Sequence, residues 1–109
     1  FLREQIDEEV YSQILSFNLL AHKTFEDSLK ALFKRDYNLA DRIISKVESS
    51  IPLENDLIKL MLSKRLDPNV SSILRLILDN SRRIMEYSRN VAEVTLNRTV
   101  EEITLTQQF

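Results

Sequence analysis

The sequence predicts an all-α protein, an elongated and antiparallel three-helix bundle. The 109 residues include no glycine and only two prolines, whereas turns and sheet bulges normally draw on glycine. Apolar residues recur every three or four positions over long stretches, which is the spacing of one face of a helix. Two short joints, at residues 34–38 and 66–69, separate these stretches. Long helices with few connections, folded as one domain, follow from these observations.

The first predicted helix covers residues 2–35. Lys34 and Arg35 at its end suit the negative C-terminal pole of a helix, and Asp36 suits the N-cap of the next helix. We therefore expect a tight turn at this joint. The apolar positions of the first helix step by three or four without interruption and are Leu2, Ile6, Val10, Ile14, Phe17, Ala21, Phe25, Leu29 and Leu32.

The second predicted helix covers residues 37–66. Pro52 lies inside it, and a proline removes one backbone donor and clashes with the carbonyl four residues earlier. We therefore expect a kink or short break around residues 49–51, with the helix restarting at Pro52 in its first turn. The predicted inner face consists of Leu39, Ala40, Ile43, Ile44, Val47, Ile51, Leu57, Ile58, Met61 and Leu62.

The third predicted helix covers residues 68–97, with Asp67 as its N-cap and Pro68 at its first position. Residues 98–109 contain three threonines beside apolar residues and are predicted to be a frayed tail or a domain-linking segment. The predicted inner face consists of Val70, Ile73, Leu74, Ile77, Ile84, Val91, Ala92 and Thr95, with the small Ser81 and Ser88 at intervening steps.

The composition argues against several classes of chemistry. The chain has no cysteine, so disulfides, thiolate metal sites and cysteine nucleophiles are excluded, and its single histidine leaves little for zinc. Nucleophile, base and orienting residue do not recur at one plausible location, and a chain without glycine has no glycine-rich phosphate loop. We therefore predict no catalytic residues and no enzyme.

The charge and hydropathy of the chain indicate which partners and which cellular location to expect. A net charge of −2 gives no basic field, so direct binding to nucleic acid is not expected. The longest apolar runs fall well short of the roughly 20 residues of a membrane span, and the N-terminal stretch is too acidic for a signal peptide. We expect a cytoplasmic protein that does not insert into a membrane.

Two segments carry a resemblance to a known family. The first is LKALFKRDYNLADRIISKVESSIPLENDL at residues 29–57, in which a short charged turn with an aspartate opens the second helix. The second is LILDNSRRIMEYSRNVAEVTLN at residues 76–97, with an Arg-Ile pair at residues 83–84, an acidic Glu86 and a closing Asn-Val-Ala-Glu run at residues 90–93. These segments resemble the PhoU domain, and the likeness spans residues 15–97.

The resemblance implies a cytoplasmic, non-enzymatic regulator of phosphate uptake and phosphate signalling. Its implied partners are a phosphate-transport ATPase or a sensor kinase. Full-length members generally contain two such bundles in tandem, so a homodimer or a partner domain would supply the second bundle here. Some members hold iron or zinc on acidic helix faces, so either metal would be the cofactor that the family suggests.

The metal motif of the family places two carboxylates four residues apart on the third helix. This sequence has Arg82 at the first of these positions and Glu86 at the second, and an arginine there favours an ion pair over a shared cation. No cofactor is therefore expected, and Glu86, Asn90 and Glu93 are only weak candidates for metal ligands. The same spacing predicts three ion pairs, Arg82–Glu86, Asp79–Arg83 and Arg89–Glu93.

The arginines of the third helix are candidates for docking an acidic partner or an anion, because a guanidinium meets a carboxylate or phosphate with two bonds. Three of them lie seven residues apart and so share one stripe, although an ordinary solvated helix surface would look the same. The candidate docking residues are Arg75, Arg82, Arg83, Glu86 and Arg89.

Two other functions remain open on the sequence. The chain could be a structural dimerisation bundle of a larger transcriptional regulator whose separate domain binds DNA. It could also be a metal-binding helical protein.

Overall fold

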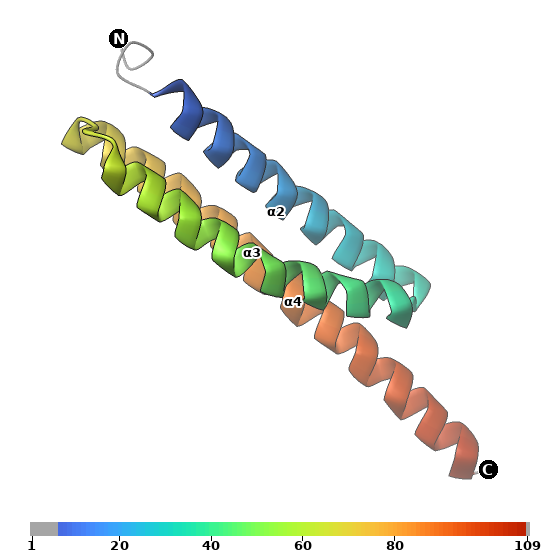
Figure 1. Ribbon diagram of the computed structural model, residues 1–109. Coiled ribbons are helices and arrows are strands. Elements are labelled where there is room, and N and C mark those ends of the chain that lie inside the picture. Colours follow the sequence, from blue (N-terminus) through green and yellow to red (C-terminus); the bar gives the residue numbers. More distant parts are fainter. Residues whose placement is uncertain (1–6, 109) are drawn as a thin grey trace.

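The computed structural model describes the backbone from Asp7 to Gln108 and the side chains as far as Arg98. Three helices pack against one another, and the described residues include no strand. They are α2 (Glu8–Lys34), α3 (Tyr37–Ser63) and α4 (Pro68–Gln108). Helices α2 and α4 run in the same direction and α3 runs back against both (Figure 1), in a body with extents of 65 × 22 × 17 Å. The predicted elongated three-helix bundle is confirmed.

Helix α2 begins at an aspartate cap. The Oδ1 atom of Asp7 accepts hydrogen bonds from the backbone N–H groups of Glu9 at 3.0 Å and Val10 at 3.2 Å. The bond from Val10, helped by Lys64, lowers the pKa of Asp7 below its ordinary value. The predicted start at residue 2, with Leu2 and Ile6 on the inner face, lies outside the described residues.

The turn between α2 and α3 forms as predicted. Arg35 caps α2 in the left-handed region at φ 54°, and Asp36 accepts a bond from the N–H of Leu39 at 3.0 Å. The N–H of Asp36 also bonds to the carbonyl of Ala31 at 2.9 Å, which closes the last turn of α2. At the second joint Asp67 caps α4 and Pro68 takes its first position, as expected, although α3 ends at Ser63 and not near residue 66.

The predicted break at Pro52 is wrong, because α3 is one helix from Tyr37 to Ser63. Pro52 and Glu48, four residues earlier, both lie on the exposed side of the helix. The carbonyl that loses its donor at a proline therefore faces water and not the core, so the helix continues without a restart.

Each helix buries one narrow seam whose positions recur at steps of three or four residues, as in a coiled coil. In α2 the seam is Val10, Ile14, Phe17, Ala21, Thr24, Ser28 and Ala31. In α3 it is Ala40, Ile43, Val47, Ser50, Glu54, Leu57 and Met61. In α4 the buried residues are Val70, Leu74, Leu78, Ser81, Met85, Ser88, Ala92 and Thr95.

The observed seams differ in part from the inner faces predicted for the three helices. Ile51, Leu62, Ile73 and Ile77 were expected inside, yet each is exposed, from 36% for Ile77 to 81% for Leu62. In α2, Phe25, Leu29 and Leu32 are only half-buried, because the smaller Thr24, Ser28 and Ala31 hold the seam. Apolar residues that lie one step beside a seam therefore end at its margin or on the surface.

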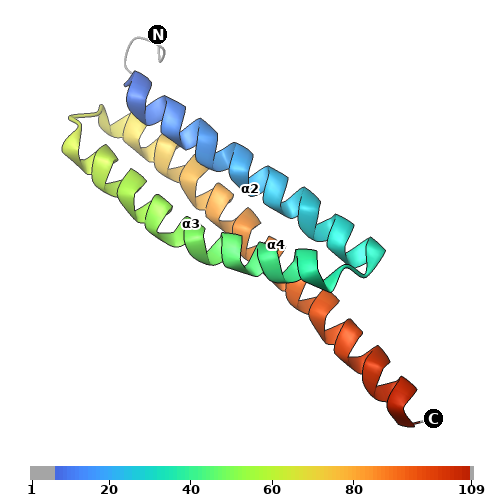
Figure 2. The same ribbon diagram turned by 45° about the vertical axis from the view of Figure 1, so that its right-hand side comes forward.

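Helix α4 continues to Gln108, so the prediction that it ends at Asn97 and frays is wrong. No glycine or proline follows Asn97, and extending a helix that already exists costs little. The last turns of α4 project beyond the other two helices (Figure 2). A linking role for this segment stays a prediction.

Replacing Arg35 tests the backbone geometry of the first turn. The left-handed conformation strains any residue with a Cβ, whereas glycine adopts it freely. We expect Arg35→Gly to be more stable than Arg35→Ala by about 1 kcal/mol in urea denaturation. Both variants lose the same side chain, so the comparison isolates the backbone. Equal stabilities would contradict a left-handed cap at this position.

Candidate functional site

Charged side chains of α3 and α4 meet in one network, here called the α3/α4 charge cluster, with Arg82 at its centre. Its Nη1 atom lies 3.4 Å from Oε2 of Glu54 on α3 and 3.5 Å from Oδ1 of Asp79. Its Nε atom lies 3.7 Å from Oε1 of Glu86, so the predicted Arg82–Glu86 pair is confirmed. One guanidinium therefore joins three carboxylates on two helices.

Glu54 is a charged residue at a seam position of α3. Only 7% of its surface is exposed to solvent. Burial raises the pKa of Glu54 above its ordinary value, and the positive charge of Arg82 opposes that rise in part. Glu54 is not among the site residues predicted from the sequence. The available signal was its place in the three-and-four spacing between Ser50 and Leu57.

Arg75 and Arg89 extend the cluster in both directions along α4. Arg75 lies 3.3 Å from Asp79, and Arg89 lies 3.0 Å from Glu93 and 3.9 Å from Glu48 of α3. The predicted Arg89–Glu93 pair is thus confirmed. These arginines are largely engaged within the bundle itself.

The predicted Asp79–Arg83 pair is wrong. Asp79 lies instead against Arg75 and Arg82, which flank it on the side facing α3. Arg83 is exposed and makes no ion pair with the described residues. Of the predicted docking residues, Arg83 is therefore the arginine whose charge stays open to solvent.

The carboxylates of this surface do not fit a metal ion. Glu86 lies against Arg82 and Glu93 lies against Arg89, while Asn90 is exposed. A guanidinium already occupies the position where a shared cation would sit. Among the described residues, no three His, Asp or Glu side chains are grouped so as to hold a metal.

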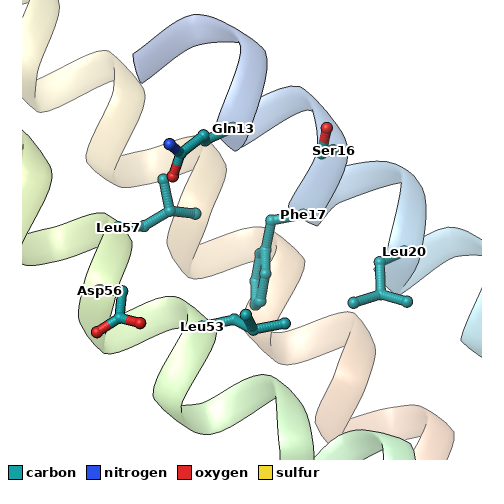
Figure 3. A pocket seen from close by; sticks show the side chains of 7 residues that line it. All are labelled: Gln13, Ser16, Phe17, Leu20, Leu53, Asp56 and Leu57. Carbon is teal, nitrogen blue, oxygen red and sulfur yellow. The ribbon is translucent and has the colours of Figure 1, made fainter. Parts of the chain in front are cut away.

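A groove of about 270 Å³ lies between α2 and α3. Phe17 projects from α2 toward Leu53 of α3, with Leu20 and Leu57 beside them (Figure 3). Gln13, Ser16 and Asp56 complete the lining and supply its polar groups. Leu20 and Leu53 are not among the residues predicted from the sequence, because both lie beside the predicted apolar stripes of their helices.

A second groove, of about 300 Å³, lies between α2 and α4 and is almost wholly apolar. We call its half-exposed apolar side chains the α2/α4 face, and they are Tyr11, Leu15, Ile73 and Ile77. Ile73 and Ile77, which were predicted to lie in the core, form its α4 side. The Nδ2 atom of Asn18 donates a hydrogen bond to Oγ of Ser81 at 2.9 Å and so fixes α2 against α4 beside the face.

Comparisons with known protein families, with curated proteins and with solved structures find no match to this chain. No helix in the described residues has the length and apolar character needed to cross a bilayer. Evidence for the function therefore comes from the sequence resemblance and from the surfaces of the three-helix bundle.

We expect Glu54→Met to stabilise the bundle by about 1 kcal/mol at pH 7, because it removes the cost of burying a carboxylate from the seam. Arg82 is 39% exposed and keeps Asp79 and Glu86, so no buried cation is left unpaired. Urea denaturation measures the change. Glu48→Met, on the exposed side of the same helix, is the matched control. Destabilisation by Glu54→Met would mean that the ion pair outweighs the burial cost.

The raised pKa of Glu54 also predicts a pH dependence. A carboxyl whose folded pKa lies above its unfolded value binds its proton more tightly when folded. Its contribution to stability is therefore full below the unfolded pKa and is lost as pH rises through the folded pKa. We expect the stability of the wild type relative to Glu54→Gln to fall as pH rises from about 4 toward 7. A difference that rises with pH would contradict the prediction.

Proposed function

We propose that this chain is a non-enzymatic regulatory interaction module of the PhoU type. It acts in the cytoplasm on phosphate uptake or phosphate signalling, through contacts with a phosphate-transport ATPase or a sensor kinase. The sequence resemblance over residues 15–97 supports the family, and the three-helix fold is compatible with it. Such a function requires an exposed surface that a partner protein can recognise.

The observation that carries the proposal is the division of α4 into a buried and an exposed side. Met85, Ser88 and Ala92 are buried, whereas Arg83 and Glu86 are exposed. Because Arg83 makes no ion pair with the described residues, its guanidinium can bind a partner carboxylate without breaking a contact of the bundle. Arg75, Arg82 and Arg89 would first have to exchange their present acidic partners.

A dimerisation bundle within a larger transcriptional regulator is the second candidate. The α2/α4 face favours it, because apolar side chains gathered on one exposed face are typical of a protein contact. Dimerisation would use the α2/α4 face, whereas the PhoU-type function would use the exposed side of α4. The two functions can therefore be tested separately.

The test is capture of a purified phosphate-transport ATPase or sensor kinase by the immobilised chain. We expect the wild type to bind one of them and Arg83→Glu to weaken binding about tenfold, because the introduced carboxylate would repel an acidic partner. Arg42→Glu is the matched control, since Arg42 is also an exposed arginine but belongs to α3 and not to α4. Failure of the wild type to bind either partner would contradict the proposal.

A further inference from the structure

Three basic side chains of α2 lie on the side that faces α3. Ser16 and Leu20 line the groove between these two helices and so mark this side (Figure 3). The buried seam of α2 repeats every seven residues, so positions seven or fourteen residues further along lie on the same side. Lys23 and Lys30 follow Ser16 at these steps. Lys34 follows Leu20 by fourteen residues, and all three lysines are exposed.

Helix α3 contributes two more cations to the same side of the molecule. Leu53 and Asp56 line the groove from α3 (Figure 3), and the seam of α3 also repeats every seven residues. Lys46 precedes Leu53 by seven residues and is exposed. Arg42 precedes Asp56 by fourteen residues and is also exposed. We call this set the α2/α3 basic face, and it consists of Lys23, Lys30, Lys34, Arg42 and Lys46.

Few carboxylates balance these cations. Asp27 lies within the face, but its side chain is only 18% exposed and pairs with Lys23 at 3.2 Å. Glu26 lies beside the face, on the outermost stripe of α2, and Asp56 lies ten residues beyond Lys46, about 15 Å along α3. The other members of the face make no ion pair with the described residues, and they are Lys30, Lys34, Arg42 and Lys46. This side is therefore basic although the whole chain carries a charge of −2.

We propose that the α2/α3 basic face adsorbs the protein to the surface of an anionic bilayer. Helices in contact lie about 8–10 Å apart, so cations on two helices do not converge on a single small anion. A bilayer is flat and its anionic lipids diffuse, so it meets cations that are spread over such a face. Groups of four or more lysines and arginines on a helical surface are typical of this electrostatic adsorption.

The make-up of the face favours lipid over a protein or a nucleic acid. Four of its five cations are lysines, which act as hydrated point charges and lack the planar fork with which arginine grips phosphate. Protein interfaces depend on apolar or aromatic anchors. Among the large exposed apolar side chains of the described residues, only Leu53 lies on this side of α2 and α3, and it belongs to the groove.

Adsorption through this face leaves α4 directed away from the lipid. Asn18 of α2 and Glu48 of α3 bind α4, and both stand on the opposite side of their helices from the groove. The cross-section of the molecule is 22 × 17 Å. Charges on the far side therefore lie beyond the Debye length of about 8 Å at physiological salt and do not cancel the attraction.

The inference goes beyond the proposed function and does not rest on it, because partner capture is assigned to the exposed side of α4. Vesicle binding without capture of a transport ATPase or sensor kinase would remove the proposed function alone. Capture by a chain that does not bind vesicles would remove the bilayer inference alone.

Vesicle co-sedimentation tests the adsorption. We expect the chain to bind phosphatidylcholine vesicles that contain phosphatidylglycerol and not to bind pure phosphatidylcholine. Each cation near an anionic surface strengthens binding about fivefold, so Lys30→Gln combined with Lys34→Gln should weaken partitioning about 25-fold. Raising the salt concentration from about 50 to 500 mM should release the wild type. Absence of binding to the anionic vesicles at the lower salt overturns the proposal.

Lys59→Gln combined with Arg65→Gln is the matched control. It removes the same charge from two exposed residues near the other end of α3. We expect it to weaken partitioning by less than about twofold, because these cations stand outside the face. Helicity by circular dichroism should match the wild type in both double variants, since all four side chains are exposed. Equal weakening by the two double variants would mean that net charge alone drives binding, and it overturns the assignment.

A fluorescent probe identifies the side that meets the lipid, because the sequence has no cysteine and one can be introduced for labelling. Ser45→Cys stands between Arg42 and Lys46 on α3, and Asn90→Cys stands on the exposed side of α4. We expect a quencher on the lipid headgroups to quench the probe at residue 45 and not the probe at residue 90. Equal quenching or the reverse order overturns the orientation.

Duplex DNA is the competing ligand. We expect it to bind more weakly than the anionic vesicles at the same salt concentration. Tighter binding of DNA than of vesicles, lost in the Lys30→Gln and Lys34→Gln double variant, would assign the face to nucleic acid and overturn the bilayer proposal.

Discussion

The bundle depends on the close meeting of three narrow seams along one axis. At the end near the joint of α3 and α4 the seams are built from large side chains, including Ile14, Phe17, Leu57 and Leu74. Toward the other end small residues are common, and they include Ala21, Ala31, Ala40 and Ala92. Small side chains let helix backbones approach closely, so this half of the bundle is held by proximity more than by the volume of its apolar groups.

Hydroxyl groups in the seams are tolerated because each described one finds a partner in its own helix. Thr24 donates to the carbonyl of Leu20 at 2.7 Å, and Ser88 donates to the carbonyl of Ile84 at 2.8 Å. Among the described residues, no buried side-chain nitrogen or oxygen lacks a hydrogen bond. Serine and threonine therefore act here as small core residues and need no partner on another helix.

The narrow seams also explain the surfaces of the molecule. Because the seams accept one line of residues per helix, apolar side chains next to that line are pushed to the margins, and they form the α2/α4 face and the α2/α3 groove. On the third side Glu54 stands in the seam itself and draws Arg82 toward α3. The resulting network engages the carboxylates of Glu54, Asp79 and Glu86, and it leaves Arg83 as the arginine most available to a partner.

The sequence by itself determined that there are three long helices, their order and the turn between α2 and α3, although it misplaced the ends of α3 and α4. The lack of glycine, the aspartates at residues 36 and 67 and the spacing of apolar residues are local signals, and local hydrogen bonding obeys them. They also located the pairs Arg82–Glu86 and Arg89–Glu93, whose members stand one turn apart on the same helix.

Only the tertiary structure decided which apolar residues face the axis. In α4, with its 3.6-residue turn, Ile73 and Leu74 are equally good candidates for the inner face, and the positions of the neighbouring helices select Leu74. The same holds for Glu54 and Arg82, which are 28 positions apart and meet only because α3 lies against α4. Contacts between helices depend on which seams pack together, and the spacing of residues within one helix does not specify this.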